Sequence, residues 1–262
     1  MSKGSRTSIS DTRNFGTPPK LPRGIHIGTS GWHYGSWRGP FYPPDVRVKD
    51  QLAYYASRFR TTEINASFYR LPTEKAVRDW RDTVPEDFLF AWKASRYITH
   101  LKRLKDCADP VALVFGRMEK LGTRFGPVLF QLPPRFHCDR ERLAGFLKLL
   151  PKARRAAFEF RHESWYEPAI FDLLSEHNAA FCISDHAAAP APFEVTADFV
   201  SLRGHGPSGH NHGTYPDAEP GEWAGHIRSW RRRRREVFVY FDNDQKSAAP
   251  KDAERLGAFF SR

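Results

Sequence analysis

The sequence predicts an α/β protein built as a single (β/α)₈ barrel of the TIM type. Short apolar runs of β-type composition alternate with helical patterns along the chain, which favours parallel strands joined by crossover helices. Eight such runs occur in about 240 residues, which is the strand content of a TIM barrel. The predicted strands are residues 25–30, 61–65, 88–93, 126–132, 156–161, 179–185, 198–203 and 237–243.

Helical patterns separate most of the predicted strands. Apolar residues recur at the helical period in residues 48–59, 143–150, 170–174 and 223–230, and again in 256–260 after the eighth strand. One connection is different. Residues 186–197, HAAAPAPFEVTA, are too short and too rich in Pro and Ala for a crossover helix. We therefore expect a helix-poor connection between the sixth and seventh strands.

The N-terminal residues differ from the rest of the chain in composition. Residues 1–23 are polar and contain no apolar signal-peptide core, so we expect a disordered tail followed by one domain over 24–262. No run approaches the roughly 20 apolar residues that a membrane span needs. The three cysteines, Cys107, Cys138 and Cys182, are odd in number, widely spaced and form no CxxC pair, which predicts buried reduced thiols. A cytoplasmic protein is therefore expected, with a monomer favoured and the oligomeric state left open.

The chain is strongly basic. Its net charge is +11 and its pI is about 9.7, which is either a means of attracting polyanions or a means of staying soluble. The run Arg231–Arg235 follows an apolar helical stripe. Arginines that close a helix complement its negative end, so this run favours a solvated helix terminus.

Polar residues end nearly every predicted strand. The C-terminal ends of the strands of a TIM barrel carry its active site, so these side chains are expected to meet at one mouth. In the fifth strand, Glu159 and Arg161 share one face by the period of two, while Phe158 and Phe160 share the other. The alternative is a set of mutually satisfied ion pairs that closes the top of the barrel. The strand-end residues are Glu63, Asn65, Lys93, Gln131, Glu159, Arg161, Asp185, Arg203, Asp242 and Asn243.

Six motifs, in chain order, resemble those of the YecE-like family, also called domain of unknown function 72. The resemblance covers about residues 25–260 and leaves out the N-terminal tail. It implies a TIM barrel but no reaction, since the family has no assigned biochemical role. The motifs are GTSGWHYGSWRGPFYP, EINASFYRLP, FAWKASRYITHLKRLKD, GPVLFQLPP, FEFRHESW and YFDND.

The leading functional hypothesis is an enzyme that acts by acid–base chemistry on an anionic, phosphate-bearing substrate. Hydrolase, lyase or isomerase chemistry would fit, and Lys93 would also serve as a Schiff-base nucleophile if its pKa were lowered. The predicted catalytic residues are Glu63, Lys93, Glu159 and Asp185. The predicted substrate-binding residues are Trp32, Asn65, Arg96, Gln131, Arg161, His162, Arg203, His205, Asp242 and Asn243.

Two other functions stay open. The carboxylates with His162 and His205 could make a metal-dependent phosphodiesterase or nuclease, but Lys93, Arg161 and Arg203 are poor neighbours for a dication. We therefore assign no metal ligand and no required cofactor, and leave a divalent metal open.

The second alternative is a non-catalytic nucleic-acid-binding protein that uses the basic helix and a long aromatic loop. That loop, residues 28–46, either stacks a base or sugar or packs its own aromatic rings as a lid. The Gly- and His-rich residues 203–222 favour a second, mobile lid.

Overall fold

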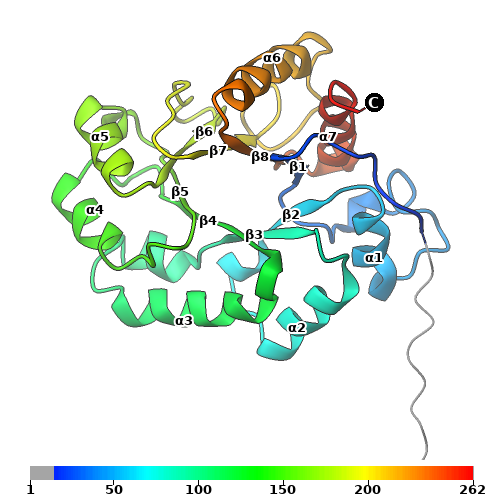
Figure 1. The fold of residues 1–262 in the computed structure, drawn as a ribbon, viewed down its shortest axis with the longest axis horizontal. Coiled ribbons are helices and arrows are strands. Elements are labelled where there is room, and N and C mark those ends of the chain that lie inside the picture. Colours follow the sequence, from blue (N-terminus) through cyan, green and yellow to red (C-terminus); the bar gives the residue numbers. More distant parts are fainter. Residues whose placement is uncertain (1–14, 262) are drawn as a thin grey trace, which may run out of the picture.

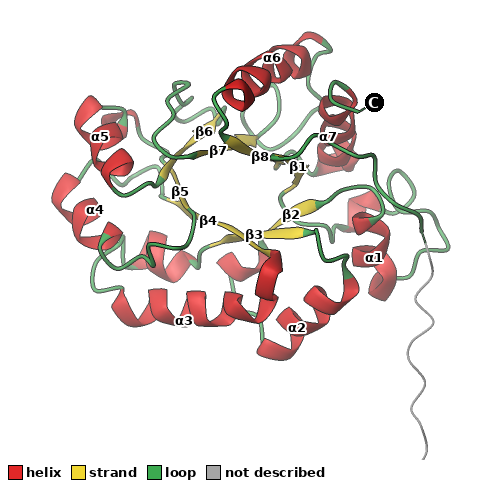
Figure 2. Cartoon of the chain, in the orientation of Figure 1, coloured by secondary structure: helices red, strands yellow, loops and turns green. Residues whose placement is uncertain are grey.

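The chain folds as an eight-stranded barrel ringed by helices (Figures 1 and 2). The computed structural model describes residues 15–261. All neighbouring strands that pair are parallel, so the predicted (β/α)₈ barrel is confirmed. The strands are β1 (Ile25–Thr29), β2 (Thr61–Ile64), β3 (Leu89–Lys93), β4 (Phe125–Gln131), β5 (Ala156–Glu159), β6 (Ala180–Ser184), β7 (Phe199–Gly204) and β8 (Glu236–Phe241).

Helices cover the outside of the barrel as the apolar stripes predicted. They are α1 (Gln51–Ala56), α2 (Glu74–Thr83), α3 (Ala108–Met118), α4 (Arg140–Leu147), α5 (Pro168–Glu176), α6 (Ala218–Arg232) and α7 (Ala248–Ala258). Arg231 and Arg232 lie in the last turn of α6, as expected for a solvated helix terminus.

The connection between β6 and β7 contains no helix, as predicted. The Thr196 side chain supplies hydrogen bonds that anchor this helix-free connection. The Thr196 hydroxyl accepts a hydrogen bond from the Phe181 amide at 2.7 Å and donates to the Ala179 carbonyl at 2.7 Å. The segment is therefore held against the start of β6 by a threonine hydroxyl, since a coil has no helical face to pack there.

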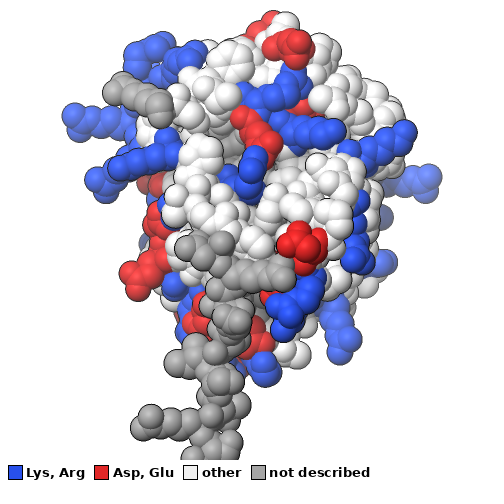
Figure 3. All heavy atoms as spheres, turned by 90° about the vertical axis from the view of Figure 1, so that its right-hand side faces the viewer, with Lys and Arg blue, Asp and Glu red and all other residues white. Residues whose placement is uncertain are grey.

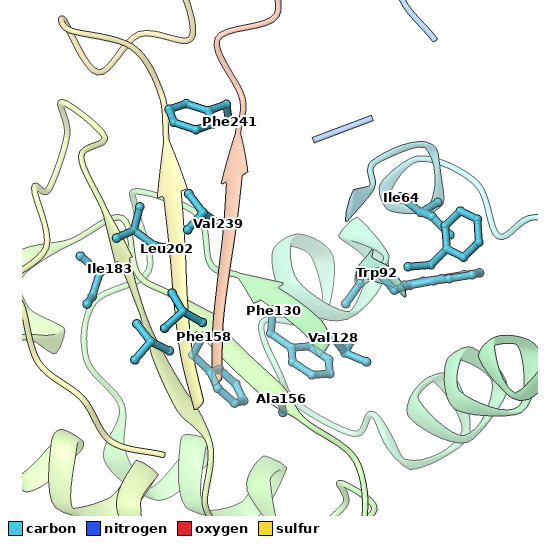
Figure 4. Packing of buried hydrophobic residues seen from close by; sticks show 14 of the residues in the cluster. Ile64, Trp92, Val128, Phe130, Ala156, Phe158, Ile183, Leu202, Val239 and Phe241 are labelled. Atoms are coloured by element: carbon cyan, nitrogen blue, oxygen red, sulfur yellow. The ribbon is translucent and has the colours of Figure 1, made fainter. Parts of the chain in front are cut away.

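The core lies on both sides of the sheet. Large side chains point outward to the helices, and Figure 4 shows Phe130 and Phe158 among them. The rings of Phe158 and Phe160 are buried and stack on neighbouring aromatics, so the predicted alternation in β5 is confirmed. The interior cluster is smaller and includes Ala91, Ala157, Cys182, Phe238 and Tyr240. It fills the barrel below the polar strand ends.

The seam between β1 and β2 closes the barrel in an unusual way. The sheet order runs from β1 through β8 to β2, and the two end strands share one bridge, at Ser30 and Glu63. Below it, the Tyr55 hydroxyl of α1 accepts from the Thr29 amide at 2.9 Å and donates to the Thr61 carbonyl at 3.1 Å. A helix side chain thus replaces a backbone hydrogen bond of the sheet.

Gly28 is required at this seam by close approach. A Cβ atom at position 28 would lie 2.1 Å from the Thr61 carbonyl oxygen and 3.0 Å from the Tyr55 hydroxyl. Any side chain would therefore displace the backbone of β2, the Tyr55 ring, or both.

Most of the predicted disordered tail, residues 1–14, lies outside the described residues, and Phe15 and Leu21 already pack against the core. Cys107 and Cys182 are buried free thiols, whereas Cys138 is only half-buried. Between residues 15 and 261, the helices are all too short or too polar to cross a bilayer.

We predict that Tyr55→Phe lowers the free energy of unfolding by about 2 kcal/mol, because it leaves a buried amide and a buried carbonyl without a partner. Tyr54→Phe is the matched control, since Tyr54 is a half-buried tyrosine of the same helix whose ring packs against Phe15, Phe41 and Tyr42. Urea unfolding of both variants measures the difference. Equal, small losses would contradict the role of Tyr55 in closing the barrel.

Candidate functional site at the barrel mouth

Arg203 lies at the centre of the mouth, which is the end of the barrel formed by the C-terminal ends of the strands. Its side chain is fully buried and contacts carboxylates from three other strand ends. Nη1 donates to Glu159 Oε2 at 2.6 Å, and Nη2 donates to Glu63 Oε1 at 2.8 Å. Nη2 also lies 3.1 Å from Asp242 Oδ2. One guanidinium thus joins β2, β5, β7 and the end of β8.

Arg161 and His205 extend this cluster. Arg161 Nη2 lies 2.5 Å from Glu159 Oε1 and 3.0 Å from His205 Nε2, and Arg203 Nη1 lies 3.1 Å from the same nitrogen. Because a guanidinium only donates hydrogen bonds, His205 Nε2 must accept, which assigns the proton to Nδ1. Nδ1 lies 3.3 Å from Asp185 Oδ1. The ion-pair cluster is Glu63, Glu159, Arg161, Arg203, His205 and Asp242.

The cluster fixes the charges of its own members. Burial alone would raise the pKa of Glu159, but the guanidinium groups of Arg161 and Arg203 outweigh it and hold this pKa well below its ordinary value. Burial likewise opposes the charged form of Asp242, and Arg203 and Lys93 again lower the pKa. Both groups are therefore carboxylates that position cations. A carboxylate of this kind is a poor proton donor near neutral pH.

Lys93 is the exception among the buried cations. Its side chain is 7% exposed, and its Nζ lies 4.8 Å from the centre of the Phe68 ring. Within residues 15–261, the ion pairs of the nearby carboxylates Glu63, Glu159 and Asp242 go to Arg161, Arg203 and His205 and not to this amine. Burial and the Arg203 charge lower the pKa of Lys93, and the charges of Asp242, Glu63 and Glu159 oppose them only in part. This amine therefore has access to its neutral, nucleophilic form.

The side of the mouth near β3 is electropositive. The turn that follows β3 is π-helical from Tyr97 to Leu101 and carries His100. Burial lowers the pKa of His100 to about 4, helped by the charges of Lys93, Arg96 and Arg161. The positive charges of Lys93, Arg96 and Arg161 therefore all act on the His100 imidazole.

The other predicted site residues are distributed around this cluster. Asp185 supports His205, since Oδ1 accepts from the His205 amide at 2.7 Å. Gln131 is half-buried beside Glu159 in the next strand, and Arg96 is exposed at the rim. Trp32 and Asn65 line a neighbouring cavity on the β1–β2 side.

Two further predicted residues, His162 and Asn243, make their hydrogen bonds away from the cluster. His162 caps a short helical turn by accepting from the Ser164 amide at 3.2 Å, and its ring contacts His137. Asn243 donates to Asp252 Oδ2 at 2.8 Å and to the Gly213 carbonyl at 2.7 Å, so it ties α7 to the loop before α6. Both contacts are structural.

Sequence reasoning missed three contributors. Ser30 donates to Glu63 Oε1 at 2.5 Å, and Ser184 lies 3.4 Å from Glu159 Oε1. Ser30 ends the predicted strand 25–30, and Ser184 is the last residue but one of the predicted strand 179–185, so their positions were a signal that could have identified them. Tyr215 donates to Asp185 Oδ2 from a loop without any periodic pattern. Nothing in the sequence marked it.

The donor set does not favour a divalent metal. Within residues 15–261, no group of three or more His, Cys, Asp or Glu side chains is arranged to hold a metal ion. Both Glu159 oxygens contact guanidinium groups. In this arrangement the Glu159 oxygens are therefore occupied by cations.

The sequence left the first long loop open between a binding surface and a lid, and it favoured a mobile lid for the second. In the first, Trp37 and Tyr42 are fully buried, and Phe41 contacts both rings. This is the self-packed alternative, although Trp32, Tyr34 and Phe41 are only half-buried. In the second, Asn211 Nδ2 donates to Asp242 Oδ2 at 2.9 Å, so the loop reaches the ion-pair cluster.

We predict that Arg203→Met lowers the free energy of unfolding by about 3–5 kcal/mol, because it strands buried carboxylates. Arg58→Met removes a surface ion pair with Glu254 and should cost less than about 1 kcal/mol. Chemical denaturation of the two variants at pH 7 checks the comparison. Losses of similar size would show that Arg203 does not organise the mouth.

The chain is similar to proteins whose names give a family and no activity. The family model described as "Protein of unknown function DUF72" matches residues 26–261. The UPF0759 protein YunF of Bacillus subtilis is 25% identical over 88% of this chain and 93% of its own. The UPF0759 protein YecE of Escherichia coli K12 is 33% identical over 54% of this chain and 50% of its own.

Two solved structures of DUF72 family proteins share the barrel fold of this chain. A DUF72 family protein of Thermotoga maritima superimposes with a TM-score of 0.80 at 26% identity, covering 89% of this chain and 98% of that one. A DUF72 family protein of Enterococcus faecalis gives a TM-score of 0.76 at 20% identity, over 90% and 95% of the two chains, which shows the fold alone. Because one family model spans nearly all of the barrel, the chain belongs to the DUF72 family of proteins of unknown function.

Proposed function

We propose that the mouth is the active site of an enzyme that binds an anionic, phosphate-bearing substrate and acts on it by acid–base chemistry. The observation that carries this proposal is the buried Lys93 amine, which has no carboxylate partner among the described residues. A buried cation without a counter-ion is costly unless a ligand supplies the charge. An oxyanion is that ligand.

Arg161 is the second group proposed to hold the anion. Its side chain is buried, yet its Nε has no acceptor within residues 15–261. Glu159 binds its Nη2 at 2.5 Å, which orients the guanidinium and leaves its remaining hydrogen-bond donors for a ligand. Lys93 and Arg161 both contribute to the positive field at His100, which supports a shared anion site.

The roles of the predicted catalytic residues then separate. Glu63 and Glu159 orient cations, since their oxygens contact guanidinium groups. Asp185 holds the His205 imidazole in one tautomer. Lys93 is the group proposed to exchange the proton or attack a carbonyl, because burial lowers its pKa.

The charge of the whole molecule supports an anionic substrate. The net charge is +11, and on the face drawn in Figure 3 the Lys and Arg side chains are widely spread and outnumber the acids. Such a field raises the association rate of anions. The free thiols support a reducing compartment, so the proposal places the enzyme in the cytoplasm.

We predict that Arg161→Met and Lys93→Met each weaken sulfate or phosphate binding about tenfold or more, because each removes a charge-assisted contact. Arg161→Met should unfold at nearly the wild-type temperature, since Glu159 keeps Arg203 as its partner. Isothermal titration calorimetry and thermal unfolding make the two measurements. Lys75→Met, on the exposed face of α2, is the control that should bind like the wild type.

The outcomes separate the rival functions. Wild-type anion affinity in both mouth variants would refute the proposal. Salt-dependent binding of single-stranded DNA that persists in both variants would favour the non-catalytic nucleic-acid-binding protein instead.

We also predict that the Lys93 amine loses its proton at a lower pH than an ordinary lysine. Its pKa is lowered, so the neutral amine appears as the pH rises through a value below the usual figure of about 10.4. Competitive acetylation across a pH series, read by mass spectrometry of the Lys93 peptide, gives the midpoint. A midpoint at or above the ordinary value would remove Lys93 as the acid–base group.

A further inference from the structure

A cavity of about 500 Å³ lies beside the mouth, at the C-terminal ends of β1 and β2. Its lining includes Trp32, Asn65, Tyr69 and Trp80. It adjoins the ion-pair cluster through the backbone, since the Gly31 amide in its lining donates to the Glu63 carbonyl at 2.7 Å. The proposed anion site at Lys93 and Arg161 does not use this cavity.

The walls of the cavity are aromatic and partly exposed. Trp32 and Trp80 meet edge to face, with ring centroids 5.3 Å apart. Tyr69 is 72% exposed and Val48 is 55% exposed, and both line the cavity. Large apolar side chains exposed around a concave surface are typical of ligand sites. A flat ring is the ligand shape that such walls accept.

The Asn65 side chain places a hydrogen-bond acceptor in the wall of this largely apolar cavity. Its Oδ1 atom is buried, and no donor within residues 15–261 reaches it. A buried acceptor without a donor costs free energy that a ligand N–H would recover. The ring should therefore carry a hydrogen-bond donor at its edge, as adenine does with its exocyclic amine.

A three-residue helical turn separates this cavity from Lys93. In the turn Ala66–Phe68, Ala66 lines the cavity and the Phe68 ring lies against the Lys93 amine. The Ser67 hydroxyl between them donates to the Lys93 carbonyl at 2.7 Å. The cavity and the proposed anion site are thus adjacent, and a ligand with a ring and a phosphate can occupy both.

We propose that the cavity binds the nucleobase of a nucleoside phosphate whose phosphate lies at Lys93 and Arg161. This inference rests on the proposed anion site and adds the class of substrate. Asn65 would accept from the base edge, and Trp32, Trp80 and Tyr69 would contact its faces. Stacking of a base on protein aromatics accounts for its contribution to affinity.

The test compares three probes by isothermal titration calorimetry: AMP, ribose 5-phosphate and adenosine. AMP should bind about tenfold or more tightly than ribose 5-phosphate, because only AMP carries a base to stack. Asn65→Leu and Tyr69→Ala should reduce that ratio toward one while sulfate affinity stays unchanged. Tyr69 is highly exposed, so its loss leaves the fold intact. Phe259→Ala, an exposed aromatic at the end of α7, is the control.

Each result leads to a different conclusion. Equal binding of AMP and ribose 5-phosphate, abolished by Arg161→Met, would overturn the base site and keep the anion site. Binding of adenosine that Tyr69→Ala removes, without any sulfate binding, would keep the base site and overturn the anion site. No binding of either AMP or adenosine by the wild-type protein would overturn the inference.

Discussion

The mouth of this barrel depends on one buried guanidinium. Arg203 binds Glu63, Glu159 and Asp242, so side chains from β2, β5, β7 and the end of β8 converge on one group. An isolated buried charge would be prohibitive, and so would three buried carboxylates near one another. Together, the guanidinium and the three carboxylates compensate one another's charges. The contact from Arg203 makes His205 Nε2 an acceptor and so fixes the tautomer of His205. Glu159, which binds Arg203, also orients Arg161.

The mouth is asymmetric as a result. On the Arg203 side each cation has a carboxylate, and on the β3 side Lys93 has an aromatic ring in that place. The first side satisfies the alternative that the sequence left open, mutually neutralised ion pairs at the top of the barrel. The second side is where a ligand has a reason to bind. The two interpretations of the strand ends thus apply to different halves of one site.

The sequence predicted the fold and the cluster well because both depend on local periodicity. Alternation placed Glu159 opposite Phe158, and strand ends placed Glu63 and Arg203 at one end of the barrel. It could not predict contacts made by loops. Asn243 follows a strand like the others, yet it turns toward Asp252 of α7, and Tyr215 reaches Asp185 from a segment without periodicity. Such contacts depend on the path of the loop, which apolar spacing does not encode.

The seam between β1 and β2 links the helical layer to the sheet. Every other neighbouring pair of strands is joined by a ladder of residue pairs, but here the Tyr55 hydroxyl of α1 supplies the contact between Thr29 and Thr61. The Gly31 amide and the Thr62 hydroxyl make two further links across this seam, to Glu63 and Thr29. Undocking of α1 would remove the Tyr55 link and leave these. The docking of one helix and the closure of the barrel are therefore coupled where the sheet is least continuous.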